Sequence, residues 1–83
     1  MAKVTADKIM DESLTLTEVE KLIAELDFEV GFKFLEQIVL AAENGSLSLE
    51  KAVICCERGA LLSKHLRELL QSAEERLQLL QKD

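Results

Sequence analysis

The hydrophobic positions of the chain form their longest regular pattern between Leu49 and Leu80. Apolar or small residues recur there at alternating steps of three and four for nine steps. The positions are Leu49, Ala52, Cys56, Gly59, Ser63, Leu66, Leu70, Ala73, Leu77 and Leu80. This spacing is that of a seam on a long α-helix that packs lengthwise against other helices. We therefore predict a helix over residues 49–81, roughly 50 Å long.

A second apolar stripe predicts the helix that packs on this seam. It consists of Phe28, Phe32, Leu35, Val39 and Ala42. Asp27 is placed to cap that helix at its start. Upstream, Thr17 and Glu20 have the spacing of a capping box before another apolar run. Because the phase of the pattern changes near Asp27, residues 17–43 form either one bent helix or two, and we favour a short helix that leads into a longer one.

Residues 44–48 carry the strongest turn signal of the sequence. Asn44 and Gly45 tolerate the backbone conformations that end helices, and Ser48 is a good N-cap for the next one. A tight turn between two apolar stripes predicts an all-α fold. We expect an antiparallel helical hairpin with a long second helix and spectrin-like, coiled-coil packing, with room for a short extra N-terminal helix. The expected divisions are a flexible segment over residues 1–16 and one hairpin domain over residues 17–82.

The two stripes carry more apolar surface than one hairpin interface can cover. A chain of 83 residues buries a modest share of its surface. Exposed apolar area of this extent is typical of an interaction surface. We therefore expect an oligomer or a subunit of a larger complex. The candidate packing and interface residues are Phe28, Phe32, Leu35, Val39, Ala52, Cys56, Gly59, Leu66, Leu70, Ala73, Leu77 and Leu80.

The middle of the long seam consists of small residues around Gly59. Glycine inside a helix costs about 1 kcal/mol relative to alanine, so Gly59 indicates the close approach of another group. The phenylalanines of the first helix, Phe28 and Phe32 among them, are natural fillers, and a partner helix is the alternative. The leucine-rich part from Leu66 to Leu80 is then the better candidate for contacts between chains.

The charge of the chain is concentrated in its first half. Residues 1–46 hold ten acids and four bases, whereas residues 47–83 hold six of each. A protein that grips nucleic acid normally shows a basic stripe, so we expect no direct nucleic-acid binding. No apolar run reaches the length of a membrane span, and the N-terminus lacks the apolar core of a signal peptide. We expect no membrane association and a cytoplasmic location.

Candidate catalytic chemistry is sparse. His65 is the only histidine and shares a helix face with Arg58 and Ser72, so we interpret it as a solvated surface residue. Cys55 and Cys56 lack the spacing of a zinc site, and we interpret Cys56 as a small core residue with Cys55 at its flank. We expect both to be reduced thiols. The chain is thus expected to carry no catalytic residue, no metal and no cofactor.

Several short motifs follow one another in a characteristic order. They are Phe28-Glu29, Leu35-Glu36-Gln37-Ile38-Val39, the turn from Glu43 to Ala52, Glu57-Arg58-Gly59 with Leu62, and finally Leu70, Ala73-Glu74 and Arg76. In this order and spacing the stretch from Leu26 to Leu80 resembles the small subunit family of bacterial exodeoxyribonuclease VII. The resemblance covers about 55 of the 83 residues.

The resemblance implies a non-catalytic subunit of a nuclease. The enzyme of that family degrades single-stranded DNA from either end and releases oligonucleotides. Its large subunit is expected to hold the active site, with several small subunits bound along its helical region. The resemblance thus implies that this chain binds the large catalytic subunit and supports its activity, and we expect a homo-oligomer when the chain is isolated. The alternative is a free-standing helical adaptor or self-assembling coiled coil without a nuclease partner.

Overall fold

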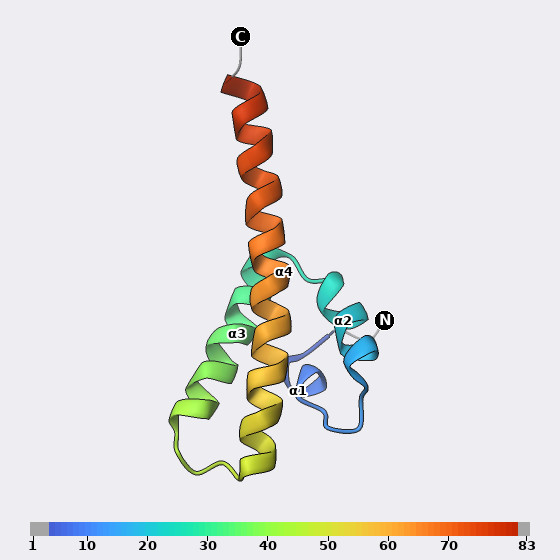
Figure 1. Cartoon of the computed structure of the whole chain (residues 1–83), viewed down its shortest axis with the longest axis vertical. Coiled ribbons are helices and arrows are strands. Elements are labelled where there is room, and N and C mark those ends of the chain that lie inside the picture. Colours follow the sequence, from blue (N-terminus) through green and yellow to red (C-terminus); the bar gives the residue numbers. More distant parts are fainter. Residues whose placement is uncertain (1–3, 82–83) are drawn as a thin grey trace.

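A computed structural model describes residues 4–81 of the chain, and every described element is helical. The helices are α1 (Ala6–Ile9), α2 (Leu16–Ala24), α3 (Phe28–Glu43) and α4 (Leu49–Gln81). In Figure 1, α3 runs antiparallel along the first half of α4, while α2 lies on the other side of α4. This arrangement confirms the predicted all-α hairpin with a long second helix and an extra helix before it.

Local capping explains where the two hairpin helices begin and end. The side chain of Asp27 accepts a hydrogen bond from the Val30 amide at 2.9 Å, so Asp27 caps α3 as expected. α3 ends at Glu43, and Gly45 follows with a φ of 74°, a left-handed conformation that favours glycine. The Ser48 hydroxyl then accepts from the Lys51 amide at 3.2 Å, which satisfies a free donor at the start of α4.

The segment before α3 is a separate short helix, and its start differs from the prediction. α2 is capped by Thr15, whose hydroxyl accepts from the Glu18 amide while the Glu18 carboxylate accepts from the Thr15 amide. The predicted cap at Thr17 is wrong by two residues, because Thr15 and Glu18 satisfy the same capping-box spacing two residues earlier. α2 ends at Ala24, so residues 17–43 are two helices.

Residues 4–16 differ from the flexible segment expected at the N-terminus. They contain α1, and the side chain of Ile9 is fully buried. Val4, Met10 and Leu14 pack around the same core. The isolated apolar residues of this stretch have no helical period, and only the tertiary fold brings them onto one surface. Residues 1–3, and position 82 at the other predicted boundary, lie outside the described residues.

The buried face of α4 is rotated from the predicted seam. Its buried residues are Cys55, Arg58, Leu62 and Leu66, whereas Cys56 is exposed. Successive helix residues point about 100° apart, so an error of one position selects a neighbouring face. The seam was inferred for one partner helix, but α4 packs on α3 and on α2. The most buried line therefore lies between the two contacts, and the interpretation of Cys56 as a core residue is wrong.

The packing of α3 is rotated in the same sense. Gly31 and Ile38 are its buried residues, while Phe28 and Phe32 are 41% and 46% exposed. The two phenylalanine rings stack on each other, with their centroids 6.1 Å apart. They do not fill the small patch of α4 as expected. A Cβ added at Gly59 would meet only ordinary contacts, at 3.8 Å from Leu35, so the close approach predicted at Gly59 is also wrong.

Candidate subunit interface

The N-terminal arm, which we define as residues 4–26, is held on α4 through a buried arginine. Arg58 is 2% exposed, and its Nη2 donates to the carbonyl oxygens of Asp11 and Leu14, both at 3.2 Å. Its Nε has no hydrogen-bond partner. A buried charge is costly unless it is paired, and this guanidinium has two neutral carbonyls as its partners. The side chain predicted to lie on the polar face of α4 is therefore a structural contact to the arm.

His65 makes the second polar contact between α4 and the chain before α3. Its Nε2 donates to the carbonyl oxygen of Leu26 at 2.8 Å. The side chain is half-buried. The prediction of a solvated surface histidine is wrong, because α2 and the linker to α3 cover this side of α4. His65 thus fixes the point where the chain passes from α2 into α3.

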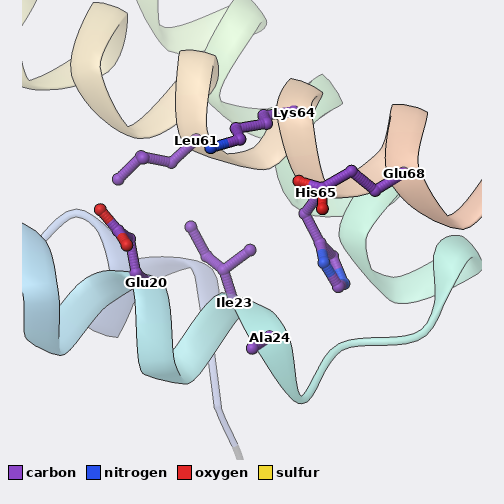
Figure 2. A pocket seen from close by; sticks show the side chains of 7 residues that line it. All are labelled: Glu20, Ile23, Ala24, Leu61, Lys64, His65 and Glu68. Carbon is purple, nitrogen blue, oxygen red and sulfur yellow. The ribbon is translucent and has the colours of Figure 1, made fainter.

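A small hollow lies beside His65, between α2 and α4. Its cavity volume is about 180 Å³, and Figure 2 shows Ile23 pointing from α2 toward α4, where Leu61 and His65 lie, with Ala24 at the end of α2. The remaining lining residues are Glu20, Lys64 and Glu68. No serine, threonine or cysteine lines the hollow, so the histidine has no hydroxyl or thiol there to activate as a nucleophile. The hollow is a packing gap with a charged rim.

Two carboxylates of the arm are stabilised in their charged form by local hydrogen bonds. The hydroxyl of Ser13 and its amide both donate to Asp11, at 2.7 and 2.9 Å, and these bonds lower the pKa of Asp11. The charge of Arg58 lowers it further, as the smallest contribution. The amide and hydroxyl of Thr15 lower the pKa of Glu18 in the same way. These carboxylates hold turns in shape and face solvent.

The thiols and the remaining acidic groups form no metal centre in the described part of the chain. Within residues 4–81, no three side chains among histidine, cysteine, aspartate and glutamate are grouped to hold an ion. Cys55 and Cys56 are free thiols, the first buried and the second exposed. Among the described helices, none is long and apolar enough to cross a membrane.

Most of the residues predicted for packing or interface lie on the surface of the structure. The exposed ones are Phe28, Phe32, Val39, Cys56, Leu70, Ala73, Leu77 and Leu80. Leu35, Ala52 and Gly59 are half-buried between the helices, and Leu66 is buried. Leu40 and Leu79, which the sequence analysis did not select, are also strongly exposed. They lie beside the predicted stripes and extend them.

Most of these exposed side chains lie on two apolar surfaces or on the end of α4. The first, on the outer side of α3, is a shallow groove of about 350 Å³ lined by Phe32, Leu35, Glu36, Val39, Leu40 and Glu43. The second lies between α3 and α4, has about 280 Å³, and is lined by Phe28, Phe32, Leu35, Ser63, Leu66, Arg67 and Leu70. Beyond it, residues 70–81 of α4 are exposed and extend past the other helices (Figure 1). Surfaces of this kind mark sites of protein–protein contact.

Comparison with known proteins relates this geometry to one family. The family described as "Exonuclease VII small subunit" matches residues 28–79, which are α3, the turn and nearly all of α4. A protein of Sinorhizobium medicae named "Exodeoxyribonuclease 7 small subunit" is 39% identical over 74% of this chain and 74% of its own length. No solved structure gave a significant match.

Relatives from other bacteria carry the same name. That of Photorhabdus laumondii is 45% identical over 70% of this chain and 63% of its own length. That of Haemophilus influenzae is 48% identical over 65% of this chain and 68% of its own length. The matched stretch contains the helical hairpin and both apolar surfaces, and the arm before α3 lies outside the family match. The chain belongs to the exonuclease VII small subunit family.

Proposed function

We propose that this chain binds the large catalytic subunit of exodeoxyribonuclease VII and supports its degradation of single-stranded DNA to oligonucleotides from both ends. The main observation behind this proposal is the exposed apolar surface of a hairpin that matches the small subunit family. The active site belongs to the partner in this proposal. The small chain contributes by covering and stabilising helical parts of the complex.

The outer groove of α3 is our proposed contact for the large subunit. Val39 and Leu40 are 44% and 66% exposed and are flanked by Glu36 and Glu43. An apolar strip with charged borders is the usual layout of a protein interface, in which a dry centre is surrounded by a polar rim. An amphipathic helix of the large subunit fits such a strip, since helix-in-groove contacts bury residues at steps of three and four.

The negative net charge of the chain favours a protein partner over direct contact with DNA. The chain has a formal charge of −6, so it would repel the phosphates of single-stranded DNA. We accordingly place DNA binding on the large subunit. A cytoplasmic location goes with this proposal, because the enzyme's substrate is intracellular DNA. We also propose that the chain self-associates when it is isolated, because its apolar surfaces then lack the large subunit.

The test is co-expression of the chain with the large subunit from the same genome. We expect a complex that survives gel filtration and degrades single-stranded DNA, while the small chain alone degrades none. Val39→Asp is expected to weaken the complex about tenfold or more, since burying a side chain of this size contributes about 1.5–3 kcal/mol. Gln37→Asp introduces the same charge on an exposed position of α3 and is the matched control.

Two results would contradict the proposal. If no complex forms with the large subunit although both chains are soluble, the chain acts without that partner. If Val39→Asp and Gln37→Asp leave the same amount of complex, the outer groove of α3 is not the contact. Salt-dependent binding of single-stranded DNA by the small chain alone would contradict the placement of DNA binding on the large subunit.

A further inference from the structure

The end of α4 continues its apolar seam where no other helix of the described chain covers it. Leu70, Leu77 and Leu80 are 50%, 55% and 84% exposed, and Ala73 between them is also exposed. Their steps of three and four place them on one side of the helix. Seams of this spacing are buried against a second helix in coiled coils. The end of α4 therefore has the pattern of a helix that packs against a second helix.

A groove that can receive such a seam lies at the base of the same helix end. The groove between α3 and α4 is bordered by Phe28 and Phe32 on one side and by Leu66 and Leu70 on the other. One molecule thus carries a projecting leucine stripe and, next to it along α4, an apolar groove. Surfaces that complement each other on one chain can be satisfied together by a two-fold dimer, in which each copy offers both.

We propose that two copies of this chain pair antiparallel through the ends of α4, crossing between Leu70 and Ala73. In this register Leu70 of one copy packs against Ala73 of the other. Leu77 lies over the groove between α3 and α4, where Leu66 is already buried against α3 of its own chain. Leu80 of each copy then lies beside Ser63 of the other, at the groove with the two phenylalanines. The inference rests on the self-association proposed above and specifies its surface. It does not depend on the large subunit.

Charges beside the seam select this orientation. Arg67 and Glu74 directly follow the seam residues Leu66 and Ala73, so both lie on one flank, and both are exposed. The antiparallel register sets Arg67 of each copy against Glu74 of the other, which gives two opposite-charge pairs. A parallel, in-register pair sets Glu74 against Leu69 and offers no such pair. Flanking charges of this kind set orientation in coiled coils.

The net charge of the chain also favours contact at this end of the molecule. Residues 67–81 contain three acids and two bases, a net charge of −1, whereas residues 1–46 carry all of the excess negative charge. Two copies that meet through the ends of α4 bring their least charged parts together. Contact through the arm would instead bring the most acidic parts together, and like charges oppose association.

The experiment measures the mass of the isolated full-length chain by sedimentation equilibrium. We expect the wild-type chain to form a dimer of 9.3 kDa protomers. Arg67→Glu and Glu74→Arg, each alone, turn both opposite-charge pairs into like-charge pairs and should weaken the dimer about tenfold or more. Glu75→Arg makes the same charge change off the seam and should leave the dimer intact. Circular dichroism of each variant checks that the helices are retained.

Mixing the two single variants gives the sharpest outcome. A copy with Arg67→Glu and a copy with Glu74→Arg form two opposite-charge pairs with each other, only if the pairing is antiparallel in this register. We expect the mixture to dimerise although each variant alone does not, and the double variant to dimerise as well. The mixture contains the same two variant chains that are tested alone. If they dimerise when mixed, each of them is folded, and loss of folding does not explain why each alone fails to dimerise.

Three results would overturn the inference. They are a monomeric wild-type chain, single variants that dimerise like Glu75→Arg, and a mixture that stays monomeric. Because the assay contains only the small chain, it is independent of the co-expression test. A monomeric chain that still binds the large subunit would overturn the antiparallel pair and the proposed self-association, and would leave the proposed binding to the large subunit standing.

Discussion

A Cβ atom placed on Gly31 would lie 2.9 Å from Cδ2 of Leu66, closer than side chains approach one another in folded proteins. Gly31 is buried in α3, and Leu66 is buried on α4. The absence of a side chain at Gly31 is thus what lets the two helices approach at this level. This contact also sets the rotation of α3, because the Gly31 side of the helix turns inward and the stacked phenylalanines turn outward.

The two helix glycines should respond in opposite ways to substitution. Gly31→Leu must displace Leu66, and we expect a loss of about 1–3 kcal/mol in the free energy of unfolding, as is typical of overpacked cores. Gly59→Ala places its Cβ 3.8 Å from Leu35, so it should gain about 0.5–1 kcal/mol from helix propensity. Urea unfolding of both variants measures the two changes. Equal destabilisation by both would show that Gly59 is also a close contact.

Removal of the Arg58 side chain should release the N-terminal arm. Arg58→Ala leaves the carbonyl oxygens of Asp11 and Leu14 without their donor and opens a cavity, which we expect to cost about 2–3 kcal/mol. Amide hydrogen exchange in residues 9–14 should rise more than exchange in α3. Lys51→Ala, at an exposed basic residue of the same helix, should change the free energy of unfolding by less than about 0.5 kcal/mol. Unchanged exchange in the arm would contradict the role of Arg58.

Stability should fall at acid pH because of the carboxylates that hold the turns of the arm. Hydrogen bonds lower the pKa of Asp11 and of Glu18 from their ordinary values of 3.8 and 4.5. A pKa that is lower in the folded state means that the stabilisation is present above the ordinary value and is lost as the pH falls through the lowered one. The thermal midpoint should therefore drop between about pH 5 and about pH 3.

A pair of isosteric variants tests the origin of this pH dependence. Glu18→Gln removes the titrating group of the capping box, so its thermal midpoint should depend less on pH than that of the wild type. Glu20→Gln, two residues further along the same helix and also exposed, is the matched control and should keep the wild-type profile. Identical profiles for all three proteins would mean that acid destabilisation arises outside the capping box.

The adjacent thiols should differ in reactivity. Cys56 is exposed and Cys55 is buried, so iodoacetamide should modify Cys56 in the native chain and Cys55 only after unfolding in urea. Mass spectrometry of the modified peptide distinguishes the two sites through the variants Cys55→Ser and Cys56→Ser. Modification of both thiols at similar native rates would contradict the rotated face of α4, because the sequence pattern assigned the core position to Cys56.

Local signals in the sequence were sufficient for most helix boundaries. Asp27 caps α3 through a hydrogen bond with Val30, and Gly45 forms the turn through its own backbone conformation. Both effects are local, so the sequence alone predicts them. The start of α2 was misplaced, because Thr15 with Glu18 and Thr17 with Glu20 have the same spacing and only geometry distinguishes them. The surplus of apolar residues in the two stripes can likewise be predicted from the sequence, because it depends only on which residues are present and how they are spaced.

The sequence by itself determined that the chain is a helical hairpin with surplus apolar surface, because caps, turn residues and helical period are local. Only the tertiary structure decided which side of each helix is covered. α4 packs between α3 and the arm, so its buried line runs through Cys55 and Arg58, one position from the periodic seam. The part of the arm before α2 shows no helical period, and Ile9 is buried there through contacts distant in sequence. The sequence shows how apolar residues are spaced along a helix, whereas the burial of each residue depends on how many other helices pack against that side.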